Sequence, residues 1–181
     1  LFYVVSAVAM PLVNVASGGT ASQSSTWAGD PARSVASHAI DGNTNGMWQF
    51  SGDPALNSLN HTNFQFQAWW QVDLGQIINI DSIVVWNRTD AVQNRLNNFS
   101  ILLDGSVIDI YNQNLGPAPS YTLSNVNMSG QIVRIQLNDA DYLHLAEVQV
   151  FAKSTADVPE PAPLALLVFG LLGLGVLRKR R

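Results

Sequence analysis

Short apolar runs with alternating side chains are the feature that most constrains how this chain can fold. Between residues 14 and 151 such runs recur, separated by Gly, Asn, Asp and Pro, and no long stretch has a helical period. In DSIVVWNR the alternation would place Ile83 and Val85 on one face of a strand and Val84 and Trp86 on the other. The pattern predicts an all-β domain built as a β-sandwich.

Three further segments support this prediction, and one long region departs from it. QIVRIQLN and LAEVQVF alternate in the same way, and FSILLDG ends in the turn signal Asp104-Gly105. Residues 20–68 show little strand pattern and are rich in Ser, Asn, Gly and Asp. A structureless stretch of this length in a compact domain is usually functional or is held in place by another group, such as an ion.

Charge is scarce and unevenly distributed. Charged residues make up 12% of the 181 residues and hydrophobic residues 47%, which fits a globular β-rich domain and argues against disorder. The net charge is −4, although four of the nine Lys and Arg are the last four residues. The rest of the chain is therefore acidic, and we expect no nucleic-acid partner. Because there is no cysteine, disulfides and thiolate metal sites are excluded.

The N-terminal residues differ in composition from the centre of the chain. Residues 1–13, LFYVVSAVAMPLV, are apolar with small residues at Ala7 and Ala9. This is typical of the remnant of a secretory signal peptide, and a first buried strand is the alternative. The sandwich domain is then expected at residues 14–153.

The C-terminal region combines a Pro-rich linker at residues 154–163 with an apolar segment and basic tail at residues 164–181. Its apolar run, Ala162 to Leu177, is shorter than the ~20 residues of a typical transmembrane helix. The order of VPEP, apolar run and basic tail resembles the PEP-CTERM sorting signal of bacterial exported proteins. That resemblance implies transient anchoring in the inner membrane, cleavage by an exosortase-type protease and delivery to the cell surface or extracellular matrix. A plain anchor helix is the alternative, and it also places the domain outside the cytoplasm.

Two of the few arginines lie around one aspartate, as Arg88, Asp90 and Arg95. In an extended chain Arg88 and Asp90 point to the same face, and Arg95 can return to it after a short turn. A carboxylate that holds two guanidinium groups would leave N–H donors directed outward, which suits a neutral, oxygen-rich ligand such as a sugar. The alternative is an ion-pair cluster that joins two surface loops.

His61 extends this group into a longer pattern. Twenty-six residues separate His61 from Arg88, which gives H-x(26)-R-x-D-x(4)-R. The pattern resembles the sugar-binding signature of the F-type lectins, or fucolectins, in the galactose-binding-like (F5/8 type C) superfamily. NVASGGTASQSSTW, ASHAIDGNTNG, WWQVDLG and YLHLAEVQVF resemble further segments of that family. The resemblance implies a jelly-roll β-sandwich that binds α-L-fucose.

The same resemblance assigns roles to the site residues. His61, Arg88 and Arg95 would bind the sugar oxygens, and Asp90 would orient the arginines. Val92 stands where many animal members have half of a disulfide that supports the sugar, and it could supply apolar surface instead. The expected rim of the site consists of three aromatic residues, each of which could instead be buried beneath its loop: Trp27, Trp48 and Phe50.

A structural calcium ion is the second implication of the family resemblance. Its ligands would be four side chains and three backbone carbonyls: the side chains of Asp41, Asn43, Ser58 and Glu147 and the carbonyls of His38, Asn43 and Ala146. Calcium takes 6–8 oxygen ligands, so the ion could join the long loop region to the last strand. The alternative is a plain Asp-Gly turn and a Glu147 that pairs with an arginine. An insertion containing GDPAL lengthens the loop before Ser58 and puts strict fucose specificity in doubt.

Together these features predict a secreted, calcium-stabilised carbohydrate-binding protein whose partners are fucosylated glycans. Binding at one site should be modest, so a homo-oligomer or clustering in a matrix would raise avidity. The alternative is a surface or matrix structural protein that kept the sandwich and lost tight sugar binding. We expect no enzyme, because a glycosidase needs two facing carboxylates and Asp90 is the only acid expected near the site.

Overall fold

The computed structural model of the chain describes residues 10–48 and 58–154. Within them the chain forms strands joined by loops and short 3-10 helices. The strands are β1 (Leu12–Asn14), β2 (Thr20–Gln23), β3 (Gln65–Phe66), β4 (Trp69–Asn87), β5 (Asn98–Leu103), β6 (Ser106–Asn112), β7 (Ser120–Leu123), β8 (Met128–Leu137), β9 (Ala140–Asp141) and β10 (Leu145–Lys153). The 3-10 helices are η1 (Ala16–Gly18), η2 (Pro31–Arg33), η3 (Ala36–Ile40) and η5 (Gln93–Leu96).

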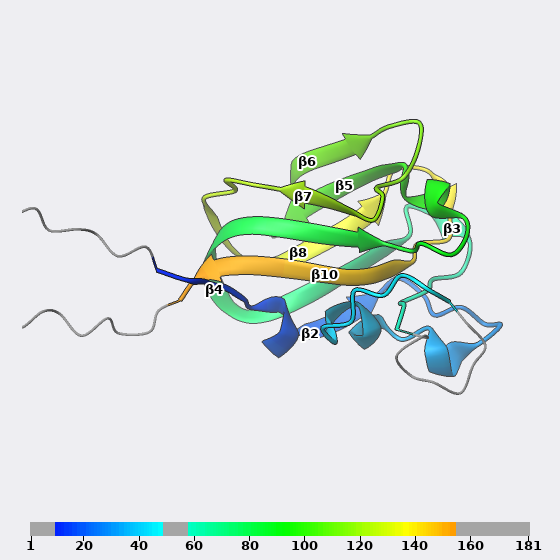
Figure 1. The fold of residues 1–181 in the computed structure, drawn as a ribbon, viewed down its shortest axis with the longest axis horizontal. Helices are drawn as coiled ribbons and strands as arrows, with labels where there is room; N and C mark the ends of the chain where they lie inside the picture. Colours follow the sequence, from blue (N-terminus) through cyan, green and yellow to red (C-terminus); the bar gives the residue numbers. More distant parts are fainter. Residues whose placement is uncertain (1–9, 49–57, 155–181) are drawn as a thin grey trace, which may run out of the picture.

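The strands form an antiparallel jelly-roll sandwich in which β4 serves both layers. The main sheet has the order β1-β10-β4-β8-β5-β6, with β2 and β7 also paired to β4, and β3 and β9 form a separate ribbon. The first part of β4 pairs with β2 and β8, and its last part pairs with β10 and β7. The register shifts between Asp73 and Ile78, where Gly75 has a φ of +77° that an L side chain rarely adopts. In Figure 1 the ribbon of β4 accordingly turns back at one end of the molecule.

The expected strand faces are confirmed. Ile83 and Val85 are fully buried, whereas Val84 and Trp86 are half-buried on the opposite face. Alternate residues of β8 and β10 enter the same core, which is centred on Trp70 and Phe99. The turn at Asp104-Gly105 joins β5 to β6 with a positive φ at both residues, as its sequence predicted.

The described part of the region 20–68, residues 20–48 and 58–68, contains β2, η2, η3 and β3, joined by loops. Its loops meet the connections 88–97, 113–119 and 138–144 at one end of the sandwich, which we call the loop end. Backbone hydrogen bonds join these loops, from Trp27 N to His61 O at 2.9 Å and from Thr89 N to Gly46 O at 2.7 Å. Figure 1 shows that β1 begins and β10 ends at the opposite end.

The two terminal segments fall mostly outside the described residues. β1 begins at Leu12, opposite Lys153 of β10, so the sheet includes two residues of the segment 1–13 that we expected to be a signal-peptide remnant. The apolar segment 164–181 lies wholly outside the described part. None of the helices in residues 10–48 and 58–154 has the length and apolar character needed to cross a membrane.

Candidate functional site

His61 lies at the centre of the loop end, in a loop that other loops hold on both sides. Its backbone N–H donates to Ser34 O at 3.3 Å, and its carbonyl accepts from Trp27 N. The Nδ1 atom lies 2.8 Å from the carbonyl oxygen of Thr62. Because a carbonyl only accepts, Nδ1 carries the hydrogen, and Nε2 of the neutral ring keeps a lone pair for a ligand hydroxyl.

The electrostatic surroundings keep this imidazole neutral. Burial lowers the pKa of His61, and the positive charges of Arg88 and Arg95 lower it further, while the hydrogen bond to the Thr62 carbonyl acts in the opposite direction. The side chain is only 4% exposed. Neutral His61 therefore offers an acceptor between two permanently charged donors.

Arg88 is oriented by Asp90, as the sequence predicted. Its Nε donates to Asp90 Oδ1 at 2.5 Å and its second amino group donates to Oδ2 at 3.1 Å. The same Oδ2 accepts the backbone N–H of Trp48 at 3.1 Å. Asp90 thus fixes the guanidinium and joins it to the loop that carries Trp48, whose ring centroid lies 5.9 Å from the guanidinium carbon.

Arg95 is held differently from our expectation. Its ion pair is with Asp141 Oδ1 at 3.5 Å, and not with Asp90. Its guanidinium carbon lies 4.6 Å from the ring centroid of Tyr142. The physical reason is that Asp90 is already engaged by Arg88 and Trp48, while η5 directs Arg95 toward β9.

Aromatic rings surround His61 and connect it to both arginines. The ring centroids of Trp27, Trp48 and Tyr142 lie 5.0, 5.5 and 5.5 Å from that of His61. Trp48 is 7% exposed, so it supports the site from below its loop, whereas Trp27 is half-buried. Phe50 lies outside the described residues.

Val92 is 37% exposed and adopts the left-handed conformation, with φ +52° and ψ +32°. A β-branched side chain rarely adopts this conformation, so the turn into η5 is strained. The structure therefore places Val92 beside the arginine-bearing helix, as a partly exposed apolar residue.

The sequence interpretation missed three residues directly before the last strand. Asp141 and Tyr142 hold Arg95, and His144 lies beneath His61, with ring centroids 5.4 Å apart. His144 is fully buried, and neither of its ring nitrogens has a hydrogen-bond partner among the described residues. Burial holds its pKa well below the usual value, and His61 and the two arginines add to this effect. The signal was present as DYLH, three ionisable or phenolic side chains in four positions, but we assigned this segment only to the closing strand.

The predicted calcium ligands also lie near one another. The carboxylate of Asp41 accepts hydrogen bonds from Ser58 Oγ and, at 2.9 Å, from Asn43 N. Glu147 Oε1 accepts from Gly42 N at 3.3 Å, and its Oε2 is buried without a hydrogen-bond partner in the described structure. Burial raises the pKa of Glu147 to about 7, and the charge of Asp41 raises it as well, against the effect of backbone hydrogen bonds. A buried carboxylate with an unpartnered oxygen, close to the exposed carboxylate of Asp41, fits a divalent cation.

The remaining oxygen ligands of the calcium ion would come from neutral groups. Among residues 10–48 and 58–154 no cluster of three or more His, Cys, Asp or Glu side chains could hold a metal. The expected set has only two carboxylates, with the other oxygens from Asn43, Ser58 and backbone carbonyls. The ring of His38 points toward the carbonyls of Arg33 and Leu59, 3.1 and 3.3 Å from its Nδ1.

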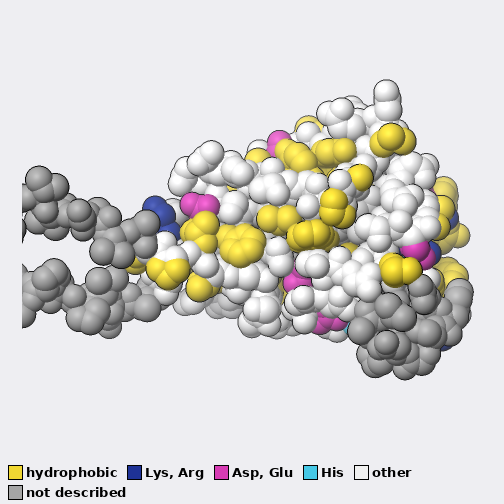
Figure 2. Space-filling model, viewed as in Figure 1, with side chains coloured by type: hydrophobic (Ala, Val, Ile, Leu, Met, Phe, Trp, Pro, Cys, Tyr) yellow, Lys and Arg dark blue, Asp and Glu magenta, His cyan; other side chains and the backbone are white. Residues whose placement is uncertain are grey.

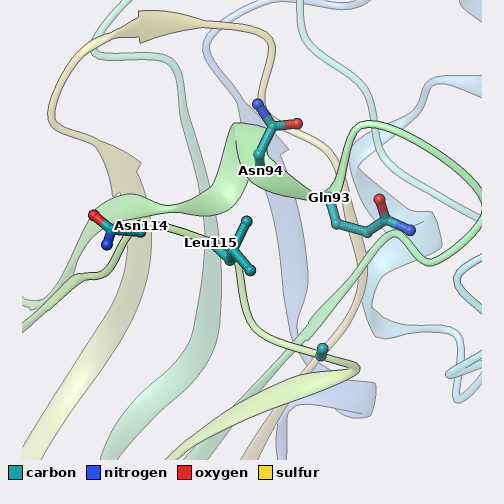
Figure 3. A pocket seen from close by; sticks show the side chains of 6 residues that line it. Gln93, Asn94, Asn114 and Leu115 are labelled. Carbon is teal, nitrogen blue, oxygen red and sulfur yellow. The ribbon is translucent and has the colours of Figure 1, made fainter.

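A separate pocket lies between η5 and the β6–β7 connection. It has a volume of about 580 Å³ and is lined by Gln93, Asn94, Asn114, Leu115, Gly116 and Ala118. Figure 3 shows Gln93 and Asn94 at η5, and Asn114 and Leu115 on the neighbouring β6–β7 connection. None of the residues expected to bind sugar lines it. The sugar site is therefore assigned from the convergence of His61 and the arginines, and not from the shape of this pocket.

Comparison with known proteins agrees with the geometry. The family model of the NedA-like, galactose-binding domain (F5/8 type C) matches residues 38–139, and the PEP-CTERM protein-sorting motif matches residues 157–181. Fucolectin-5 of Anguilla japonica is 32% identical over 149 residues, which cover 77% of this chain and 76% of that protein. Fucolectin of Anguilla anguilla is 31% identical over 147 residues, or 76% of this chain and 89% of that protein.

Solved structures give the same result. A Streptococcus pneumoniae fucose binding module, SpX-3, superposes with a TM-score of 0.67 at 29% identity and covers 78% of this chain and 99% of that one. The lectin domain of lectinolysin, solved in complex with Lewis B antigen, has a TM-score of 0.66 at 32% identity and covers 78% and 98%.

The fold and these matches define a jelly-roll domain of the galactose-binding-like, F5/8 type C class. Within that class the chain belongs to the fucolectin family, also called the F-type lectins. Its relatives are lectins and carbohydrate-binding modules, and it is a binding domain without enzymatic activity. The C-terminal PEP-CTERM motif, expected from the sequence, marks it as an exported protein.

Proposed function

We propose that this protein is an exported lectin that captures α-L-fucose-containing glycans at the loop end, through His61, Arg88 and Arg95. The observation that carries the proposal is the convergence of one acceptor and two donors. Neutral His61 contacts the rings of Trp48 and Tyr142, and Arg88 lies beside the first ring while Arg95 lies beside the second. A sugar ring carries hydroxyls that donate and accept, so it can satisfy Nε2 and both guanidinium groups together.

The relatives support the choice of sugar. SpX-3 is a fucose binding module, the lectin domain of lectinolysin was solved with Lewis B antigen, and the chain spans nearly the whole length of both modules. Val92 and the ring of Trp27 provide apolar surface near the charged groups, which suits the 6-methyl and the C–H faces of fucose. Binding is reversible, and single-site affinity is modest because each hydroxyl must lose water.

A calcium ion bound by Asp41, Asn43, Ser58 and Glu147 is part of the proposal. The orphaned Oε2 of Glu147 and the nearby carboxylate of Asp41 support it. When bound, the ion would supply positive charge that keeps both carboxylates ionised. Asp41 ends η3 and Glu147 belongs to β10, so these residues would fasten the long loop region to the sheet that carries the site.

The route to the cell surface follows from the sorting motif. We infer that the apolar segment 164–181 is transiently anchored in the membrane and that an exosortase-type protease then releases the lectin. Several copies gathered on a surface or in a matrix, or a homo-oligomer, would give avidity that one site lacks.

A glycan array tests the proposal directly. We expect wild-type signals to concentrate on fucosylated glycans and the Arg88→Ala/Arg95→Ala variant to lose them. Arg134→Ala is the matched control, because Arg134 donates to Gln71 in the sheet, at 3.0 Å from Nε, and touches none of the site residues. Equal signals from the wild type and the double variant would refute the sugar site, and a structural protein that lost sugar binding would then be the better description.

A further inference from the structure

Two exposed phenyl rings lie directly beside the proposed sugar site. Phe64 is 59% exposed and Phe66 is 67% exposed. Single exposed apolar side chains are common in soluble proteins, but adjacent large ones usually mark a binding surface. Figure 2 shows hydrophobic side chains at the surface of the loop end. Charged side chains are sparse on the face in view.

The ribbon of β3 and β9 places these rings on one face with Tyr142. Phe66 pairs with Ala140 and Gln65 pairs with Asp141, so the continuing register sets Phe64 opposite Tyr142. The rings of Phe64 and Tyr142 are in edge contact, with centroids 5.5 Å apart. Residues two apart in a strand point to the same side, so Phe66 extends the same face. We call Tyr142, Phe64 and Phe66 the aromatic strip.

The aromatic strip is continuous with the site. Tyr142 contacts the ring of His61 at 5.5 Å and carries the guanidinium of Arg95 at 4.6 Å. Exposure rises along the path, from 4% at His61 to 59% at Phe64 and 67% at Phe66. The path therefore leads from the buried acceptor to open solvent, in the direction that a glycan must leave the site.

We propose that the aromatic strip is a second subsite, which receives the sugar residue linked to the fucose. The inference rests on the proposed function, since it needs fucose at His61. Sugar rings present flat C–H faces that pack on aromatic rings, whereas their hydroxyls remain in water at the edges. Phe64 and Phe66 carry no polar group, so this subsite selects by ring shape and linkage geometry, and not by a particular hydroxyl.

Calorimetric titration of the full chain separates this subsite from the fucose site. The ligands are methyl α-L-fucoside and disaccharides of fucose with galactose or N-acetylglucosamine in different linkages. For wild type we expect at least one disaccharide to bind about three- to tenfold more tightly than the monosaccharide. In Phe64→Ala and Phe66→Ala this advantage should disappear, while the affinity for the monosaccharide stays within about twofold.

Two variants and one hydrodynamic measurement serve as controls. Phe64→Trp keeps an aromatic ring and should keep the advantage, and Ile77→Ala, which removes a 72% exposed side chain from the opposite end of the sandwich, should change nothing. An advantage that survives in both alanine variants, or that no linkage shows, overturns the subsite and leaves the fucose site intact. A wild type that binds neither ligand overturns both proposals. A dimer that dissociates in Phe64→Ala, seen by sedimentation, would assign the strip to a second copy of the chain and also overturn the inference.

Discussion

The strand-built body and the loop end of this molecule are stabilised in different ways. Apolar side chains fill the body, and its polar backbone is satisfied by the strand ladders. Nearly all buried polar side chains instead belong to the loop end, namely Ser34, Ser58, Asn60, His61, Thr62, Asn87, His144 and Glu147, with Ser100 in β5 as the exception. Burying polar groups costs free energy unless each finds a partner, and His144 and Glu147 still have ring or carboxylate atoms without one.

This difference indicates that the functional groups lie at the loop end. The body could be built from any well-packed sandwich sequence, whereas the loop end keeps unpaired and strained groups that a purely structural end would not need. Val92 in the left-handed region and the buried carboxylate of Glu147, whose pKa the charge of Asp41 raises, are further examples. Changes in the body should therefore alter stability, and changes at the loop end should alter binding or ion dependence.

The largest effect is expected in the body, from Trp70→Ala. Trp70 is fully buried, and its Nε1 donates to Ala36 O at 2.8 Å, which also holds η3 against the sheet. Loss of the ring should lower the free energy of unfolding by about 3–5 kcal/mol. Urea denaturation measures this directly. A loss below about 1 kcal/mol would mean that the body is not the source of stability.

The next largest effect is expected from removal of calcium. Calcium at about 100 times its Kd should stabilise the protein by ~2.7 kcal/mol, or roughly 5–10 °C in Tm. Chelator should therefore lower the Tm of wild type and leave Glu147→Gln unaffected, while Asp81→Asn, in β4, should respond as wild type does. The calcium proposal fails if chelator leaves the wild-type melting curve unchanged.

Loss of one arginine should weaken binding and hardly alter stability. Charge-assisted hydrogen bonds contribute ~1.5–3 kcal/mol, so Arg88→Ala should lower the affinity for fucose by about tenfold or more. The side chains of Arg88 and Asp90 are 12% and 19% exposed, and Asp90 keeps its hydrogen bond from Trp48 N in the variant, so the free energy of unfolding should fall by only about 1 kcal/mol. Calorimetry and urea denaturation of the same sample compare the two effects. If Arg88→Ala lost much of its unfolding free energy but bound fucose as tightly as wild type, Arg88 would be a stabilising residue and not a binding residue.

Sugar binding should depend on the protonation of His61. Its pKa in the folded protein is lowered from 6.5, so the neutral form is present above that pH, and its contribution to stability is lost as the pH falls below 6.5. Protonation turns Nε2 into a donor beside two arginines. With calcium in excess, affinity should be constant above pH 6.5 and should fall, by up to about tenfold per pH unit, below the lowered pKa. His61→Gln should flatten this profile, and an affinity that rises on acidification would contradict the assigned tautomer.

The smallest effect is expected from Val92→Gly. Relief of the left-handed conformation, φ +52°, should outweigh the added freedom of the unfolded chain and raise stability by roughly 0.5–1 kcal/mol. The midpoint of urea denaturation should shift upward at an unchanged slope. A shift in the other direction would show that the packing of Val92 outweighs its backbone strain.

Much of the fold could be predicted from local sequence, and less of the site. The faces of Ile83 and Val85 follow from the two-residue period of a strand, and the bond between Arg88 and Asp90 follows from the same period. The pairing of Arg95 with Asp141 could not, because it depends on how η5 packs against the β3–β9 ribbon, 46 positions along the chain.

The burial of His144 could not be predicted from the sequence either. A histidine before an apolar strand can lie on the surface or beneath a neighbouring loop, and only the register of β10 against β4 decides between them. Likewise, the exposure of Phe64 and Phe66 follows from the short β3–β9 ribbon, which no local pattern indicated. The features that the sequence interpretation missed thus depend on contacts between segments that are distant along the chain.

A crystal structure of the protein soaked with L-fucose tests the central claim most directly. The account predicts one fucose at the loop end, with a ring or hydroxyl oxygen within hydrogen-bond distance of His61 Nε2 and of both guanidinium groups, and with Arg88 still bound to Asp90. Fucose bound in the pocket beside Asn114 and Leu115, or elsewhere without contact to His61, would contradict it.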